Sequence, residues 1–382
     1  MSHIHVQSPD QAEGLGAELR SARRLALDCE AAGFHRYSDR LCLLQLSTEG
    51  GTWVIDPLAF DPSGLLREPL QNPDVTVVMH GADFDLRLLR RDLGVRLHGL
   101  FDTQIAAQLL GEEGLGLSAL LEARLGVHLS KKYQRADWAE RPLNPGMLDY
   151  AADDTRYLLR LADILRDELV AAGRAEWAVE ECRALEAAAD DTGEPSERED
   201  PVARVRGARQ LSARQVTALR EALMWRDEVA RERDKAPFRI ISDAPLIEAV
   251  AAAPRDVAQL LQIKGFPTRI AQEEGHELVR RLQRVATLSD SELRPYPRPT
   301  RRGPGRPTPE MDALAERLKD VRNRRADEVG LPRGALLANA VLLDVARAAP
   351  KDIDALAQVG GMRRWKVELL GKDFLTVIRG AR

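Results

Sequence analysis

LALDCE (Leu25–Glu30) is the stretch of sequence that decides the fold of the first part of the chain. It is a short apolar run with acids at i and i+2, a spacing that places Asp28 and Glu30 on one face of a β-strand. Leu27 and Cys29 then point into a core on the other face. Two carboxylates on an otherwise apolar face repel each other and lose hydration, so a divalent cation between them is the simplest explanation. The alternative is a solvent-exposed strand end, because an isolated D-x-E pair is common.

Further strand-like and helical runs surround this stretch. LCLLQLS (41–47), TWVIDP (52–57) and TVVMHG (76–81) are short runs with strand character. DFDLRLLRRDLG (Asp83–Gly94) has helical spacing and ends on a glycine suited to cap a helix. Helices are also predicted up to Gly111, over Leu117–Leu125 and over Met147–Val170. Early strands followed by alternating strands and helices predict an α/β domain, with a mixed sheet covered by helices.

Two more acidic motifs follow along the chain. HGADFDL (80–86) carries Asp83 and Asp85 where a strand gives way to a helix, so one acid can cap the helix while the other faces a site. YAADD (150–154) carries Tyr150 and Asp154 at i and i+4 on a helix, which puts them on one face, whereas Asp153 faces about 100° away. Taken singly, each residue has an ordinary explanation as a helix cap, an exposed acid or a packed aromatic.

The order of the three motifs is more specific than any one of them. A D-x-E strand, an acid at a strand–helix junction and a Y-x-x-x-D helix can together bring carboxylates around two divalent cations about 3.5–4 Å apart. Such a pair activates water for attack on a phosphodiester and stabilises the leaving 3′-oxygen. Tyr150, one turn before Asp154, can orient the attacking water. The pattern therefore predicts a nuclease that uses two divalent metal ions, Mg²⁺ or Mn²⁺.

Charge is divided unevenly between the halves of the chain. The net charge of −4 combines a net of −15 over residues 1–200 with a net of +11 over residues 201–382. An acidic half can hold cations, and a basic half can follow a phosphate backbone. The alternative is two ordinary solvated surfaces of opposite sign.

Two polar segments and one internal repeat divide the chain into domains. The acidic DDTGEPSERED begins at Asp190, and the Pro/Arg-rich SDSELRPYPRPTRRGPGRP begins at Ser289. Between and after them, an all-helical module of about 75 to 80 residues occurs twice, with Pro237, Asp256 and Gly265 answered by Pro332, Asp352 and Gly361. The predicted domains are a first α/β domain (1–190), a linker (191–210), a helical domain (211–288), a second linker (289–308) and a second helical domain (309–382).

Other features of the sequence exclude several classes of protein. No run approaches about 18 consecutive apolar residues, so no membrane association is expected. The first residues lack the basic and apolar regions of a signal peptide. Three scattered cysteines without a C-x-x-C pair argue against a disulfide framework or a zinc site. A cytoplasmic location is therefore expected.

With these motifs in place, the chain resembles the ribonuclease D family of DEDD-superfamily exonucleases, in the subclass with tyrosine in the third motif. LALDCE, HGADFDL and YAADD match the three exonuclease motifs, and FDTQIAAQLLG (101–111) and KKYQRADWAERPL (131–143) also resemble the family. The repeated modules resemble HRDC domains. The resemblance implies an α/β ribonuclease H-like exonuclease domain followed by two small all-α HRDC-like domains. It selects Asp85, which follows the aromatic Phe84, over Asp83 as a metal ligand beside Asp28, Glu30 and Asp154.

The resemblance also implies an activity. It is 3′→5′ hydrolysis of RNA with release of nucleoside 5′-monophosphates, on tRNA precursors and other RNA with an accessible 3′ end, without a small-molecule cofactor. One alternative is a DNA-directed exonuclease of the same superfamily, against which the lack of a helicase motor or Walker motif counts. Another is a non-catalytic RNA-binding protein that retains the fold, against which the intact carboxylate set counts.

Several further residues have two interpretations each. Asp102 either caps a helix or supports the site, and Trp138 is a packing residue rather than a base-stacking one. Four polar residues before the third motif either contact substrate phosphates or belong to a solvated loop: Lys131, Lys132, Gln134 and Arg135.

Overall fold

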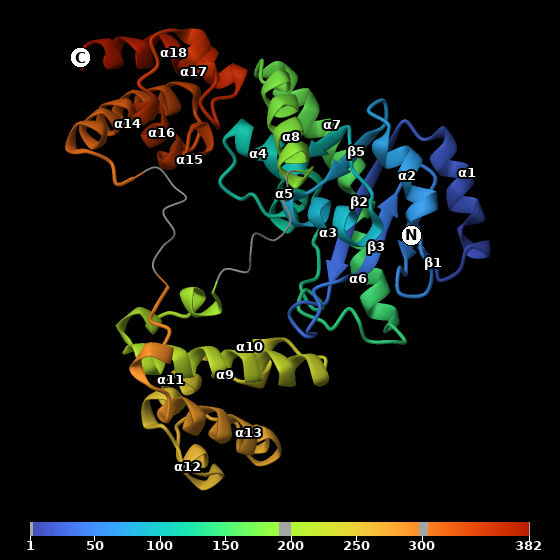
Figure 1. Cartoon of the computed structure of the whole chain (residues 1–382). Coiled ribbons are helices and arrows are strands. Elements are labelled where there is room, and N and C mark those ends of the chain that lie inside the picture. The colour runs from blue at the N-terminus through green and yellow to red at the C-terminus, as the bar shows by residue number, and fades with distance from the viewer. Residues whose placement is uncertain (1–2, 191–199, 298–304, 382) are drawn as a thin grey trace.

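The computed structural model of the chain describes residues 3–190, 200–297 and 305–381. Residues 191–199 and 298–304 of the two predicted linkers lie outside the described residues. Figure 1 shows an N-terminal domain built around a sheet, a first helical module that contains α9–α13 and a second helical module that contains α14–α18. Among the described residues, no helix combines the length and the apolar character needed to cross a bilayer.

A six-stranded mixed sheet forms the centre of the N-terminal domain, in the order β1-β4-β3-β2-β5-β6. β2, β3 and β4 pair antiparallel, while β1 pairs with β4, and β5 with β2 and β6, in parallel. The strands are β1 (Ile4–Val6), β2 (Arg24–Ala31), β3 (Leu41–Ser47), β4 (Thr52–Ile55), β5 (Thr76–Met79) and β6 (Leu100–Asp102). The sheet confirms the predicted α/β class. β1 and β6 have three residues each, which is too short for an alternation pattern to predict.

The two faces of the sheet are covered by different helices. Leu25, Leu27 and Cys29 of β2 belong to the hydrophobic cluster shared with α1 (Glu13–Ser21), α2 (Ser63–Gln71) and α3 (Asp83–Leu93). The opposite face, which carries Asp28 and Glu30, packs against α6 (Pro145–Arg156) and α7 (Leu158–Ala171). The alternation in LALDCE thus separates an apolar face from a carboxylate face.

The helix predicted over Met147–Val170 is two helices. The ladder is interrupted at Tyr157, whose backbone has φ −108° and ψ −3° and whose N–H donates to the carbonyl of Thr155. Thr155 is fully buried, and its hydroxyl lies 2.8 Å from that of Ser47 on β3. Met147 consequently packs in a cluster with β3 and β4, whereas Leu158 belongs to a different cluster. The prediction of one continuous helix over Met147–Val170 was wrong, because periodicity alone does not register a short interruption.

Three more helices complete the N-terminal domain: α4 (Thr103–Leu110), α5 (Leu117–Leu125) and α8 (Ala175–Asp190). α8 packs against β6, α3 and α4, and it also contacts the second helical module (Figure 1). A short 3-10 helix, η1 (Asp10–Ala12), precedes α1.

The two helical modules have the same order of helices, as the repeat predicts. The first contains α9 (Ala213–Glu232), α10 (Pro237–Ile240), α11 (Asp243–Ala252), α12 (Val257–Leu261) and α13 (Thr268–Ala286); the second contains α14 (Pro309–Val329), α15 (Arg333–Leu336), α16 (Asn339–Ala348), α17 (Ile353–Ala357) and α18 (Arg364–Arg379). Asp256 and Asp352 both cap a helix through their side chains. Gly265 and Gly361 both take a positive φ, of 80° and 86°.

Part of each predicted linker is packed rather than extended. Residues before α9 form η2 (Pro201–Arg204) and η3 (Ala208–Gln210), and Val202, Val205 and Ala208 are buried in the core of the first module. After α13, η4 (Asp290–Glu292) follows, and Tyr296 packs against the same core. The first module therefore begins near residue 200 and extends to about residue 296, because three small apolar side chains among polar neighbours are enough to bury these turns.

Candidate active site

Three of the predicted metal ligands meet on the carboxylate face of the sheet. One carboxylate oxygen each from Asp28, Glu30 and Asp154 lie within 4.8 Å of one another, a spacing that could hold a metal ion. β2 supplies the first two residues, and α6 supplies Asp154 from the helix that covers this face. This is the only group of this kind among the described residues.

Asp85 and Asp83 have different environments in the first turn of α3. Asp85 is 7% exposed, whereas Asp83 is exposed and pairs with Arg87 one turn later. β2 and β5 run parallel, so the start of α3 after β5 lies beside the end of β2 that carries Asp28. Asp85 lies outside the three-residue group but interacts electrostatically with Asp28. The buried acid of the second motif is thus the one that faces the group.

Burial dominates the electrostatics of these four carboxyl groups. It raises the pKa of Asp28 to about 7 and, together with the charge of Asp28, the pKa of Asp154 to about 8. Burial, followed by repulsion from Asp28, also raises the pKa of Glu30 and Asp85 well above the usual range. Asp28 is the common neighbour of the other three. Within the described ranges, none of the four forms an ion pair with a basic side chain, so no protein cation offsets the cost of ionising them.

This donor set fits divalent cations. Hard cations such as Mg²⁺ and Mn²⁺ take carboxylate oxygens, and their charge offsets the repulsion among buried acids. All four candidate ligands offer only oxygen. Cys29, which alternates with them on β2, points into the opposite core.

Tyr150 is held by two aromatic rings from the segment before α6. Its ring centroid lies 6.0 Å from that of Trp138 and 6.2 Å from that of Tyr133. Trp138 is 2% exposed, which agrees with its prediction as a packing residue. Burial, followed by the charge of Asp154, raises the pKa of the Tyr150 hydroxyl further above its ordinary value. The hydroxyl is therefore neutral near pH 7 and can donate a hydrogen bond.

The segment that holds Tyr150 is anchored to the sheet by an ion pair between the partly exposed Arg141 and the buried Asp56. Arg141 donates to both carboxylate oxygens of Asp56 at 2.7 and 2.8 Å and to the carbonyl of Cys42 at 2.9 Å. Asp56 is 1% exposed, and the adjacent arginine lowers its pKa against the effect of burial. The four polar residues named as substrate contacts lie in the same segment, exposed to solvent: Lys131, Lys132, Gln134 and Arg135.

Asp102 caps α4, which was one of the two roles predicted for it, and it also holds the start of α3. Its carboxylate accepts four backbone hydrogen bonds, from Gly81, Ala82, Gln104 and Ile105. Two of these donors lie in the turn before Asp85. Asp102 thus joins the β5–α3 turn to the start of α4 and fixes where α3, the helix that carries Asp85, begins.

Gln45 was not among the site residues predicted from the sequence. It lies directly opposite Asp28 in the β2–β3 register and so on the same face of the sheet. Its side chain is fully buried, and neither Nε2 nor Oε1 has a hydrogen-bond partner among the residues that the structure describes. A buried amide without partners costs about 1–3 kcal/mol, so its retention beside the acids points to the site. The available signal was a single amide in the otherwise apolar LCLLQLS.

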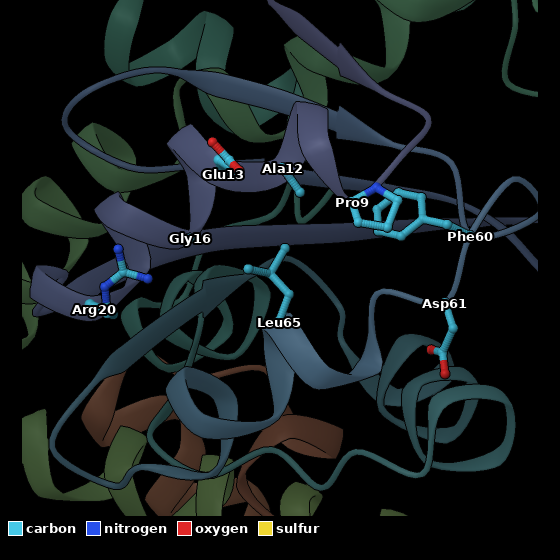
Figure 2. Close-up of a pocket in the computed structure, with 8 residues that line it drawn as sticks. All are labelled: Pro9, Ala12, Glu13, Gly16, Arg20, Phe60, Asp61 and Leu65. Atoms are coloured by element: carbon cyan, nitrogen blue, oxygen red, sulfur yellow. The ribbon is translucent and has the colours of Figure 1, made fainter.

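The hollow between α1 and α2 contains none of these residues. It measures about 550 Å³ and lies among residues of η1 and the turn before it, α1, the β4–α2 loop and α2 (Figure 2): Pro9, Ala12, Glu13, Gly16, Arg20, Phe60, Asp61 and Leu65. These helices cover the apolar face of the sheet. The carboxylates lie on the other face, where α6 and α7 pack.

Comparison with known proteins agrees with this arrangement. Residues 4–170 match the family model described as 3′-5′ exonuclease, and residues 215–282 and 311–378 each match the HRDC domain model. The chain is 31% identical over 375 residues to ribonuclease D of Sphingobium indicum, which covers 95% of this chain and 91% of the relative. A crystal structure of a protein from Bifidobacterium adolescentis superposes with a TM-score of 0.81 at 28% identity, covering 98% of this chain and 96% of the other.

The similarity extends to longer proteins. The chain is 33% identical over 254 residues to the exosome complex component 10 homolog of Caenorhabditis elegans, a match over 66% of this chain and only 29% of that protein. Fold, motifs and matches define a ribonuclease H-like 3′-5′ exonuclease that carries two HRDC domains. The chain belongs to the ribonuclease D family, which confirms the predicted family and enzyme class.

Proposed function

We propose that the protein is a metal-dependent 3′→5′ exoribonuclease that hydrolyses RNA from its 3′ end and releases nucleoside 5′-monophosphates. The observation that carries the proposal is the convergence of Asp28, Glu30 and Asp154 within 4.8 Å, with buried Asp85 alongside. A protein that had kept only the fold would have no physical reason to retain four buried acids without a counter-charge.

The carboxylates are proposed as the ligands of two divalent ions, Mg²⁺ or Mn²⁺. Bound there, such ions would activate a water for attack on the phosphodiester and stabilise the leaving 3′-oxygen. Asp28 is the electrostatic neighbour of the other three, which supports the proposal that it would help to hold both ions. Tyr150 orients the attacking water through its neutral hydroxyl, while Trp138 and Tyr133 keep the ring in place.

Substrate contacts are proposed on the segment that precedes α6. Lys131, Lys132, Gln134 and Arg135 are exposed there, and Lys132 lies 5.0 Å from the ring centroid of Tyr133, which in turn packs on Tyr150. This chain of contacts supports the proposal that the exposed cations meet the phosphates of the 3′ segment. The exonuclease domain itself is acidic, so these few cations matter for holding a polyanion.

We propose RNA rather than DNA as the substrate, because the chain aligns over nearly the full length of a ribonuclease D. tRNA precursors are the proposed physiological RNA, and the two HRDC domains are proposed to bind its phosphate backbone. The proposed exonuclease domain covers residues 1–190, and the proposed HRDC domains cover residues 211–288 and 309–382. The packed turns on either side extend the first HRDC domain from residue 200 to about residue 296.

One experiment tests the chemistry, the direction and the substrate together. RNA and DNA oligomers labelled at the 5′ end, each with a free or a blocked 3′ end, are incubated with Mg²⁺ or Mn²⁺ and with EDTA. The expected result is stepwise shortening of the free-ended RNA, with mononucleotide release, that EDTA abolishes. Equal shortening of blocked RNA would exclude 3′→5′ polarity, and faster shortening of DNA would favour the DNA-directed alternative.

A further inference from the structure

Two exposed phenylalanines from different domains meet at the junction of the exonuclease domain and the first helical module. Phe34 lies in the loop after β2 and Phe238 lies in α10, and their ring centroids are 5.5 Å apart at an interplanar angle of 52°. The two residues remain 48% and 50% exposed. The guanidinium of Arg239 lies 4.9 Å from the centroid of the Phe34 ring. Large aromatic side chains left open to water in this way are a recurrent mark of a binding surface.

The aromatic pair lies close to the carboxylates. Phe34 follows Glu30 by four residues, so the two Cα atoms are at most ~14 Å apart. Ala32, between them, packs in the hydrophobic cluster that also contains Tyr150. The ring of His35 lies 2.8 Å from the carbonyl oxygen of Arg135, in the segment proposed to contact phosphates. The pair therefore borders the active site on the side of the first module.

The first module is also docked by contacts other than the one between these rings. Tyr37 donates a hydrogen bond to Asp227 at 3.0 Å and packs against the module's core, while Arg36 bridges Asp137 and Asp234. The backbone N–H of Ala236 donates to the carbonyl of His35 at 3.1 Å. Arg239 Nε also donates to the carbonyl of Phe34 at 2.8 Å. These polar contacts hold the junction, but they do not explain why both rings remain about half exposed.

The charge around the pair suits a polyanion. The acids at the junction, Asp137, Asp227 and Asp234, are each bonded to an arginine or to the Tyr37 hydroxyl. Arg239 lies over the Phe34 ring, and the segments on both sides of the junction carry further exposed cations: Lys132, Arg135 and Lys235. Among the described residues the third exposed phenylalanine is Phe84, directly before Asp85. Exposed aromatics interleaved with cations are the usual means of holding single-stranded nucleic acid.

We propose that Phe34, Phe238 and Arg239 form a platform on which unpaired bases near the RNA 3′ end stack as the strand enters the active site. Because Phe238 and Arg239 come from the first module, the platform is complete only when that module is docked. Stacking on a ring face does not distinguish bases, so the platform holds any unpaired 3′ segment and disfavours a paired one. The proposal rests on the proposed exoribonuclease function and adds to it a site for the unpaired segment.

The test measures binding without hydrolysis, in the full-length Asp28→Asn protein. A hairpin RNA with an unpaired 3′ tail carries the fluorescent adenine analogue 2-aminopurine at successive tail positions, because stacking changes its emission. We expect a change at one or two positions, lost when Phe34→Leu or Phe238→Leu is added and kept with Phe34→Tyr. Leucine retains the apolar contact across the junction but cannot stack. The leucine variants should bind the tailed hairpin roughly 5- to 150-fold more weakly, and tyrosine should restore binding.

The remaining outcomes are distinguishable. If leucine and tyrosine variants bind the tailed hairpin equally and no position changes its emission, the aromatic pair is a docking contact only and the platform is rejected. If the leucine variants lose affinity equally for a hairpin without a tail, the loss reflects undocking of the module, and the platform is again rejected. Failure of the wild-type protein to degrade the same RNA would reject the proposed function instead, whichever way the stacking signal falls.

Discussion

Trp177 of α8 and Trp365 of α18 stack with ring centroids 4.4 Å apart and an interplanar angle of 15°. The indole N–H of Trp365 donates to Glu181 at 3.0 Å, and Lys366 pairs with the same carboxylate at 2.6 Å. α14 and α18 share one hydrophobic cluster with α4 and α7. The second HRDC domain is thus packed on the exonuclease domain as part of its core, whereas the first docks through the short contact around Tyr37.

Removal of the second HRDC domain should therefore damage the exonuclease domain. A chain that ends at residue 297 would expose Trp177 and the apolar face beneath it, so we expect aggregation and a lower melting temperature. Trp365→Ala in the full chain should cost about 3–5 kcal/mol of stability, as for other buried large-to-small changes. Met224→Ala, at a 52% exposed position of α9, is the control and should change little. Thermal melting and size-exclusion chromatography provide the measurement. A monomeric, equally stable truncated chain would contradict the shared core.

The four carboxylates should be individually essential for hydrolysis. Asp28→Asn, Glu30→Gln, Asp85→Asn and Asp154→Asn are each expected to abolish RNA shortening and to leave the metal-free protein as stable or more stable, because each removes repulsion in a buried cluster. Asp83→Asn is the matched control from the same helical turn, since Asp83 is exposed and paired with Arg87. Rates on labelled RNA, with melting curves in EDTA, check both effects. Loss of activity in the Asp83 variant with retention in the Asp85 variant would reverse the assignment.

Stability of the metal-free protein should fall as pH rises. Burial raises the pKa of Asp28 to about 7 and of Asp154 to about 8, so the folded state keeps protons that the unfolded state releases from about pH 4 upward. The free energy of unfolding in EDTA therefore decreases between about pH 4 and about pH 8. Mg²⁺ or Mn²⁺ should restore stability most at the upper end, because cations bind only the folded, ionised site. Melting curves across this range, with Asp28→Asn as comparison, test the slope; a flat profile in EDTA would refute it.

Tyr150 should act in the chemical step rather than in binding. Tyr150→Phe keeps the ring against Trp138 but removes the hydroxyl, so kcat should fall by about 10- to 1,000-fold with little change in RNA affinity. Tyr157→Phe, which alters the tyrosine at the break between α6 and α7, is the control and should retain full rate. Single-turnover kinetics separates the two steps. An unchanged rate in Tyr150→Phe would make Tyr150 a packing residue.

Gln45 should matter to metal binding more than to folding. Gln45→Leu removes a buried amide without partners, so the metal-free protein should gain roughly 1–3 kcal/mol. Calorimetric titration should show weaker Mn²⁺ binding, because the amide opposite Asp28 is expected to orient that carboxylate once a cation is bound. Ser47→Ala is the control on the same strand, where the hydroxyl is already bonded to Thr52 and Thr155, and should destabilise instead. A stability gain with unchanged Mn²⁺ affinity would leave Gln45 without a role in the site.

Local patterns in the sequence were sufficient for much of this protein. The alternation in LALDCE separates Asp28 and Glu30 from Leu27 and Cys29, and side-chain direction along a strand follows from the backbone alone. The i, i+4 spacing puts Tyr150 and Asp154 on one helix face for the same reason. The repeated proline, aspartate and glycine positions define two like modules, because each sets a local turn or cap. Such features need only neighbours in the chain.

Tertiary structure decided everything that depends on residues distant in sequence. Gln45 gains its position from the β2–β3 register, and Trp138 reaches Tyr150 from a segment that the Arg141–Asp56 pair joins to the sheet. The break at Tyr157 and the contrast between the two HRDC domains, one sharing the exonuclease core and one docked at Tyr37, also arise from long-range packing. Periodicity predicts which side of a helix or strand is apolar. Which other helix or strand covers that side depends on the packing of the whole chain.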